Sequence, residues 1–212
     1  MFGIIQFPVF VSSAIVLNLT PGADTIYILG RSMTGGRKAG VVSALGITAG
    51  AFIHTILAAL GLSVILAKSA TAFNVVKLLG AAYLIYMGVR TFLNKQPLLD
   101  DASQPGAPMG LRKVFFQGML TNVLTPKVAL FFLAFLPQFI DPANSFGPLP
   151  FLLLGCTFLC TSTLWCITLA FLSDAIRRLL ARRAGVSKAL NKITGVVFVA
   201  LGLNLLRAKM EA

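Results

Sequence analysis

Residues 2–29 read FGIIQFPVFVSSAIVLNLTPGADTIYIL, an apolar run long enough to cross a lipid bilayer. The run is interrupted by Asn18, Pro21, Gly22 and Asp24. A proline inside a helix removes a backbone donor and kinks or breaks the helix. Backbone that is freed in this way has to face protein or a water-filled cavity rather than lipid. This stretch therefore predicts a membrane-spanning helix that is broken at a polar site.

The composition of the whole chain agrees with a membrane protein. Of its 212 residues, 57% are hydrophobic and 11% are charged, whereas a soluble domain is about 25% charged. The 18 Lys and Arg exceed the 6 Asp and Glu, which gives a net charge of +12. In an apolar chain such an excess gathers in cytoplasmic loops, and no basic patch interleaved with aromatic residues indicates nucleic acid. We expect membrane lipid, not nucleic acid, around this chain.

Five further apolar runs follow along the chain. They cover residues 39–66, 73–92, 114–140, 149–172 and 190–206. Backbone groups in lipid have to be paired within their own segment, so these runs should be helices. The sequence therefore predicts an all-α integral membrane protein with six transmembrane helices. The sixth run is short, and if it does not span the membrane, the C-terminus lies on the other side.

The distribution of basic residues predicts the orientation. Thirteen Lys and Arg gather on the side that the chain reaches after the first, third and fifth runs, and four lie on the opposite side. The positive-inside rule places the larger group in the cytoplasm. Both termini then face outward from a cell inner (plasma) membrane. Residues 174–188 are either a solvated cytoplasmic loop, which the rule favours, or an amphipathic helix lying on anionic lipid.

The two halves of the chain resemble each other. NLTP at Asn18–Pro21 parallels NVLTP at Asn122–Pro126, and KLLGAAY at Lys77–Tyr83 parallels KITGVVF at Lys192–Phe198. Because three crossings are an odd number, a repeated three-helix unit inserts upside down, which is the inverted-repeat plan of many secondary transporters. We predict one transporter domain made of two inverted three-helix repeats, with a proline-broken first helix in each half. It comprises repeat one at residues 1–93, a linker at 94–113 and repeat two at 114–212.

Three ionisable residues lie deep inside the runs, namely Asp24, His54 and Lys127. Charge in the hydrocarbon region is costly, so such residues are functional hypotheses by default. Asp24 and Lys127 each follow a proline, and paired broken helices are the sequence pattern of a transporter site. We expect Lys127 to hold a carboxylate, and Asp24 to hold an ammonium group or a proton. The alternative is that the two charges pair with each other as a structural element.

Several other residues in the apolar runs are candidates for binding, for proton transfer or for packing. Asn18 and Asn122 can supply neutral donors and acceptors to the same site. His54 either relays protons near neutral pH or is a neutral histidine bonded across a helix interface. Trp165, like Tyr83 and Tyr86, is expected to be a packing or interface anchor, and Gly46 and Gly50 are expected to allow close helix packing. The cysteines are expected to be small apolar fillers; they are Cys156, Cys160 and Cys166.

The scarcity of reactive groups argues against other classes of protein. With one histidine and no CxxC motif, no zinc or other metal site can be assembled, and no cofactor is expected. A membrane-embedded enzyme needs clustered carboxylates, histidines or a nucleophile with its base, and a carrier of an inorganic or metal ion needs more such ligands. Both stay as less favoured alternatives. No phosphate-binding P-loop occurs, so any transport is driven by a gradient.

Four sequence motifs resemble the LysE/RhtB family of amino-acid exporters. NLTPGAD at Asn18–Asp24 resembles the family's Pro-Gly-Pro-Asn/Asp element, and LGAAYLIYMG at Leu79–Gly88 resembles its third-span pattern. NVLTPK at Asn122–Lys127 and FFLAFLPQF at Phe131–Phe139 resemble its Asn-Leu-Thr-Asn-Pro-Lys and Pro-Gln-Phe elements. Two residues depart from the pattern: Ala23 replaces the second proline, and Thr125 replaces the usual Asn or Asp before Pro126.

The resemblance implies a secondary exporter of small amino acids or their derivatives that works by proton antiport. It implies no enzyme activity. It implies that the substrate site includes Pro21, Gly22, Asp24, Asn122, Pro126 and Lys127. To these the residues themselves add Asn18 for the substrate, and Asp24 with His54 for the proton. The expected partners are an amino acid, protons and membrane lipid. The sequence leaves the oligomeric state open, a homodimer included.

Overall fold

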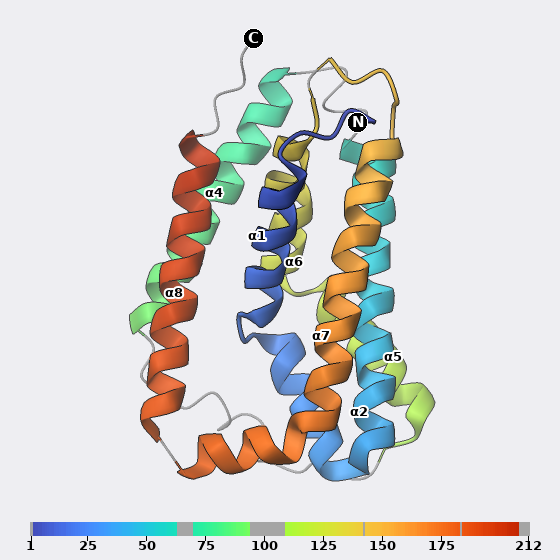
Figure 1. Cartoon of the computed structure of the whole chain (residues 1–212), viewed down its shortest axis with the longest axis vertical. Helices are drawn as coiled ribbons and strands as arrows, with labels where there is room; N and C mark the ends of the chain where they lie inside the picture. The colour runs from blue at the N-terminus through green and yellow to red at the C-terminus, as the bar shows by residue number, and fades with distance from the viewer. Residues whose placement is uncertain (1, 63–69, 94–108, 142, 183, 208–212) are drawn as a thin grey trace.

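The computed structural model describes residues 2–62, 70–93, 109–141, 143–182 and 184–207. Figure 1 shows a bundle of helices, most of which run along one long axis. Apart from an isolated antiparallel bridge between Ile4 and Ile140, the elements within the described ranges are all helical. The predicted linker at 94–113 lies largely outside these residues.

The first run of the sequence forms two helices with a break between them. Helix α1 covers Phe7–Leu19 and helix α2 covers Ala23–Leu57. Thr20 and Gly22, on either side of Pro21, have extended backbone conformations. Pro21 has no amide hydrogen to donate, so the helix cannot continue through it. The break predicted from NLTP is therefore present.

Helix α2 turns back on itself at Gly36. This residue has φ 70° and ψ −175°, which are non-helical angles that a glycine adopts without steric cost. In Figure 1 the chain descends through the first part of α2, turns at the bottom and returns upward along the second part. The π-helical turn η1, at Ala58–Leu62, continues the second part. The two parts are called α2 residues 23–35 and α2 residues 37–57 below.

The second half of the chain contains a matching break. Its elements are helix α5 at Leu111–Val123, helix α6 at Pro126–Leu130, the π-helical turn η2 at Phe131–Phe135 and the 3-10 turn η3 at Leu136–Phe139. The axis bends by 51° at this break. Pro126 is the first residue of α6, and Thr125 before it is extended. This is the position that the second motif predicts.

Three long helices complete the bundle, namely α4 at Ala70–Leu93, α7 at Leu149–Arg182 and α8 at Ala184–Arg207. Figure 1 shows α4 and α8 side by side at one edge, and α7 beside the second part of α2. The lower end of α7 bends and runs across the bottom of the bundle. Residues 174–182 are therefore helix, so the solvated loop favoured by their charge is wrong. The charge of a segment does not distinguish a loop from a helix, because a helix can also turn a polar face toward water.

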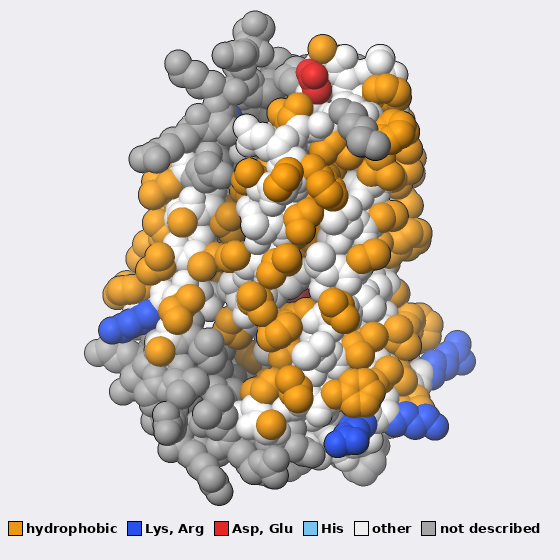
Figure 2. Space-filling model, viewed as in Figure 1, with side chains coloured by type: hydrophobic (Ala, Val, Ile, Leu, Met, Phe, Trp, Pro, Cys, Tyr) orange, Lys and Arg blue, Asp and Glu red, His pale blue; other side chains and the backbone are white. Residues whose placement is uncertain are grey.

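By length and composition, two helical stretches of the described residues are apolar enough to cross a membrane: Ala23–Leu62, which includes the turn at Gly36, and Leu149–Ser173. The bent pair formed by α5 and α6 to η3 makes a third if it is one span. Figure 2 shows apolar side chains along the height of one face, with Lys and Arg near its lower edge. The protein is an all-helical membrane protein.

Close packing of the second part of α2 against α5 positions the second break. A Cβ atom at Gly46 would collide with the backbone carbonyl of Phe115 in α5, and one at Gly50 would lie 2.7 Å from Cβ of Asn122. The close packing predicted from the spacing of these glycines is confirmed. Above the breaks, α1, η2, η3 and α7 enclose an aromatic core in which the rings of Phe131 and Phe158 are 4.9 Å apart.

Candidate functional site

Lys127 joins the second break to the first. Its Nζ atom donates hydrogen bonds to the backbone carbonyls of Thr20, at 2.8 Å, and Leu17, at 3.4 Å. The last carbonyls of a helix have no partner within the helix, and α1 ends at Leu19. Lys127, which is 5% exposed, therefore caps the C-terminal end of α1 from the other half of the chain.

Asp24 lies in the first turn of α2, just beyond the first break, and is 8% exposed. Its Oδ2 atom accepts a hydrogen bond from Nδ2 of Asn122 at 3.0 Å. The hydroxyl of Thr125 is 3.4 Å from Oδ1, but it is also 2.6 Å from the carbonyl of Thr121. Because a hydroxyl has one hydrogen, Asn122 is the principal partner. The positive end of the α2 dipole favours the carboxylate as well.

The two charges are held by different partners. Within the described ranges, no ion pair of 4.0 Å or less joins Asp24 to Lys127. Asp24 is bonded to side chains of the second half, and Lys127 is bonded to backbone of the first half. The direct pair that sequence analysis offered as an alternative is therefore absent from this conformation.

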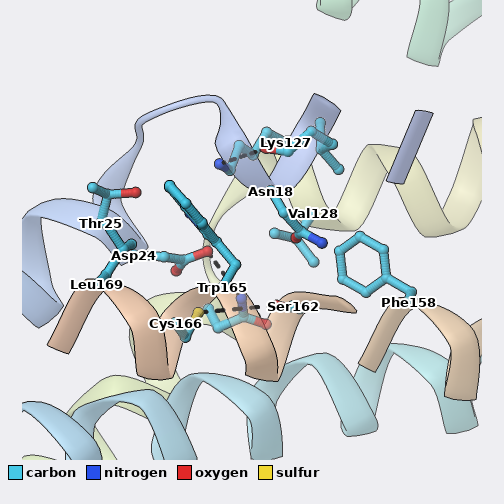
Figure 3. Close-up of a pocket in the computed structure, with 12 residues that line it drawn as sticks. Asn18, Asp24, Thr25, Lys127, Val128, Phe158, Ser162, Trp165, Cys166 and Leu169 are labelled. Carbon is cyan, nitrogen blue, oxygen red and sulfur yellow. Dashed lines mark hydrogen bonds between the residues drawn. The ribbon is translucent and has the colours of Figure 1, made fainter. Parts of the chain in front are cut away.

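A small cavity lies between the two breaks and α7 (Figure 3). Its volume of about 20 Å³ is enough for about one water molecule. The breaks contribute Asn18, Asp24, Asn122 and Lys127 to its wall, and α7 contributes Phe158, Ser162, Trp165 and Cys166. No amino acid fits into a space of this size, so this conformation is closed.

The remaining residues predicted for the site end a helix at a break, leave space beside Lys127 or form a hydrogen bond to α7. Pro21 and Pro126 end their helices, as described above. A Cβ atom at Gly22 would lie 3.3 Å from Nζ of Lys127, so the glycine leaves room for the ammonium group. Asn18 donates from Nδ2 to Oγ1 of Thr161 in α7 at 3.2 Å.

His54 is not among the residues that line the cavity. The imidazole stacks on the ring of Phe132, with centroids 5.7 Å apart, and lies beside the backbone of Asn122 and Val123. Its Nε2 atom is buried and has no hydrogen-bond partner among the residues that the structure describes. His54 therefore contacts the backbone of the residue whose side chain holds Asp24.

Sequence reasoning missed the contribution of α7. Trp165 and Cys166 were expected to be packing residues, and both do pack in the apolar cluster of α2 and α7, but both also line the cavity together with Ser162. The spacing of Ser162, Trp165, Cys166 and Leu169 is that of one helix face. That pattern is visible in the sequence, but nothing in an uncharged apolar run indicates which face turns toward the breaks.

A set of polar contacts closes the bundle below the cavity. The hydroxyl of Tyr27 donates to the backbone carbonyl of Val114 at 2.8 Å, and Nη2 of Arg31 donates to Oε1 of Gln117 at 3.2 Å. The guanidinium of Arg31 also lies over the Tyr27 ring, 5.5 Å from its centroid. These contacts join the first part of α2 to α5.

One protein-family model matches a range of the chain that includes both breaks and α7. The family model described as LysE type translocator matches residues 15–209. The chain belongs to the LysE type translocator family. This is a family of transporters, not enzymes, so the cavity between the breaks of this LysE-type translocator lies in a protein that moves small molecules.

The relatives of this translocator are bacterial membrane proteins. The chain is 33% identical to the uncharacterized membrane protein YrhP of Bacillus subtilis (strain 168), over 92% of this chain and 95% of the relative. It is 28% identical to an uncharacterized membrane protein of Vibrio cholerae, over 94% and 96% of the two chains. It is 29% identical to the uncharacterized membrane protein PA4757 of Pseudomonas aeruginosa, over 99% and 98%. No solved structure matches the chain. With its apolar spans, this translocator is a multi-pass integral membrane protein.

Proposed function

We propose that this LysE-type translocator exports small amino acids or amino-acid derivatives across the inner membrane by proton antiport. The observation that carries the proposal is the pair of hydrogen bonds that joins the two breaks. Asp24 and Lys127 are opposite charges on facing broken helices, and they border one cavity without pairing. An amino acid carries an ammonium and a carboxylate group, which match these two charges.

In this proposal the chain crosses the membrane six times, as two inverted three-helix repeats at 1–93 and 114–212. The direction of the broken helices supports it. In Figure 1, the chain enters the first break from the top through α1 and the second break from the bottom through α5. The third helices of the two repeats, α4 and α8, also run in opposite directions side by side. Transporters of this plan bind substrate where the two broken helices meet.

The substrate and the proton compete for the same groups in the proposed mechanism. Opening toward the cytoplasm releases Lys127 from the Thr20 carbonyl, and the freed ammonium group binds the substrate carboxylate. Asp24 binds the substrate ammonium group and loses its proton to the cytoplasm. After the substrate leaves on the outer side, Asp24 takes up a proton there. His54, which lies beside the backbone of Asn122, is the second proton-handling residue in this proposal.

The donor set favours an amino acid over a metal ion. Within the described ranges, no group of three or more His, Cys, Asp or Glu side chains could hold a metal ion. The cavity wall instead offers one carboxylate, one ammonium group and two amides. Such a mixture suits a molecule with both an acidic and a basic group.

The test is transport by purified protein in proteoliposomes with an imposed pH gradient. A panel of radiolabelled amino acids is offered, with protein-free vesicles as the blank and Lys127→Met protein as the matched control. We expect at least one small amino acid to accumulate in wild-type vesicles only while the gradient lasts. Movement of an inorganic ion, without movement of any amino acid in the panel, would refute the proposal.

A further inference from the structure

Trp165 extends from α7 into the cavity. Figure 3 shows its indole ring between Asp24 on one side and Asn18 on the other. The side chain points from α7 toward the loop of the first break. A tryptophan that only anchors the protein at the membrane surface has its N–H group near the headgroups. This one instead borders the space that separates the two charges of the site.

The indole N–H has no acceptor in the closed conformation. Nε1 of Trp165 is buried, and no partner for it exists in the described part of the chain. An unpaired buried donor costs free energy, and buried indole groups usually find a partner. The nearby amides are bonded through their donor atoms, Asn122 to Asp24 and Asn18 to Thr161, and neither amide accepts a hydrogen bond from the indole. The contents of the cavity can supply the acceptor that Trp165 lacks.

A second unpaired atom borders the same cavity. Oδ1 of Asn122 is buried and has no donor within the described ranges. The cavity thus presents one unused donor and one unused acceptor, in a space that holds about one water molecule. A ligand can bind these two atoms without first breaking a hydrogen bond of the protein.

We propose that Trp165 binds the transported molecule directly, and that its indole N–H donates a hydrogen bond to the substrate carboxylate. This inference rests on the proposed function. In the backbone of a zwitterionic amino acid, the carboxylate is the group that can accept a hydrogen bond. In the closed state a water molecule can take its place, and exchange of that water for a carboxylate oxygen preserves the hydrogen bond.

The variant Trp165→Phe tests this role, because phenylalanine retains an aromatic ring and lacks the N–H. We expect the KM for the transported amino acid to rise about tenfold, because a hydrogen bond to a charged group is lost. The maximal rate should stay within about twofold of wild type, since folding and conformational change are intact. Leu164→Ala is the matched control, because Leu164 is the preceding residue of α7 and is 72% exposed. Its KM should not change.

Fluorescence gives a second measurement that does not depend on the variant. Trp165 is the single tryptophan of the chain, so the intrinsic emission reports on this cavity. We expect the emission of wild-type protein in nanodiscs to change saturably with the transported amino acid, at a midpoint near the KM. The same amino acid as its methyl ester, which lacks the carboxylate, should give a weaker response.

The outcomes separate this inference from the proposed function. If wild-type vesicles transport no amino acid, the proposed function fails and the role of Trp165 fails with it. If wild type transports, but Trp165→Phe leaves the KM within twofold and the substrate leaves the emission unchanged, only the role of Trp165 is overturned. A large rise in KM with a saturable emission change supports both.

Discussion

The ammonium group of Lys127 is bonded at 2.8 Å to the backbone carbonyl of Thr20, which lies 107 residues earlier in the chain. A second hydrogen bond, donated by Asn122 to Asp24, spans 98 residues. The charged residue of each broken helix thus has its hydrogen-bond partner in the other half. Any motion that opens the cavity between the breaks has to loosen one of these contacts, and this makes them the first targets for mutation.

Asp24→Asn should abolish export that is driven by a pH gradient. The amide can still accept a hydrogen bond from Asn122, but it cannot bind and release a proton. We expect insertion into the membrane to be normal, and gradient-driven transport in proteoliposomes to fall to the level of protein-free vesicles. Full export by this variant would rule out Asp24 as the proton-coupling residue.

Lys127→Met should weaken the binding of substrates that have a free carboxylate. Methionine fills similar space, but it removes the charge and leaves the Thr20 carbonyl without its donor. We expect the KM of a transported amino acid to rise about tenfold or more, while its amide derivative is affected less. Equal losses for the acid and the amide would show that Lys127 does not bind the carboxylate.

His54→Gln distinguishes a proton relay from a packing residue. Glutamine is polar but does not titrate near neutral pH. We expect gradient-driven export to fall about tenfold, whereas exchange of labelled for unlabelled substrate, measured without a gradient, stays at the wild-type rate. If both rates are unchanged, His54 serves only to pack against Phe132.

Tyr27→Phe should loosen the closure below the cavity. The change removes the hydrogen bond to the carbonyl of Val114 and retains the ring beneath Arg31. We expect a cysteine placed at Thr25, in a variant without native cysteines, to react about fivefold faster with a water-soluble thiol reagent. An unchanged reaction rate would mean that this contact does not limit access to the cavity.

Gly46→Leu should destabilise the protein by separating the second part of α2 from α5. The new side chain would overlap the backbone of Phe115, and overpacking of this kind costs about 1–3 kcal/mol or more. A thermal melt in detergent should therefore show a lower Tm. Gly30→Ala is the control, because a Cβ atom at Gly30 meets nothing within 4 Å. A similar loss in both variants would argue against the close contact.

The helix breaks were predictable because their cause is local. Pro21 and Pro126 cannot donate a backbone hydrogen bond, and this holds in any tertiary context. The deep positions of Asp24 and Lys127 followed from the lengths of the apolar runs around them. The apolar runs also predicted where the helices lie, although the segment after residue 173 continues as helix and not as a loop.

The parts that sequence could not predict depend on how helices are rotated and paired. Trp165 has the same chemistry on a lipid-facing side of α7 as on the side that faces the breaks, and only packing determines which one it occupies. The same holds for the bond from Lys127 to Thr20. The sequence predicts a charge and an unpaired carbonyl, but the short distance between them requires the two halves to be folded together.

The cap on α1 has a consequence for biosynthesis. The carbonyl of Thr20 emerges from the ribosome 107 residues before the lysine that pairs with it. Unpaired carbonyls are costly in hydrocarbon, so the newly made first half has to keep this end of α1 in contact with water or with the insertion machinery. The nascent chain therefore completes the cap of its first helix only after Lys127 has been translated.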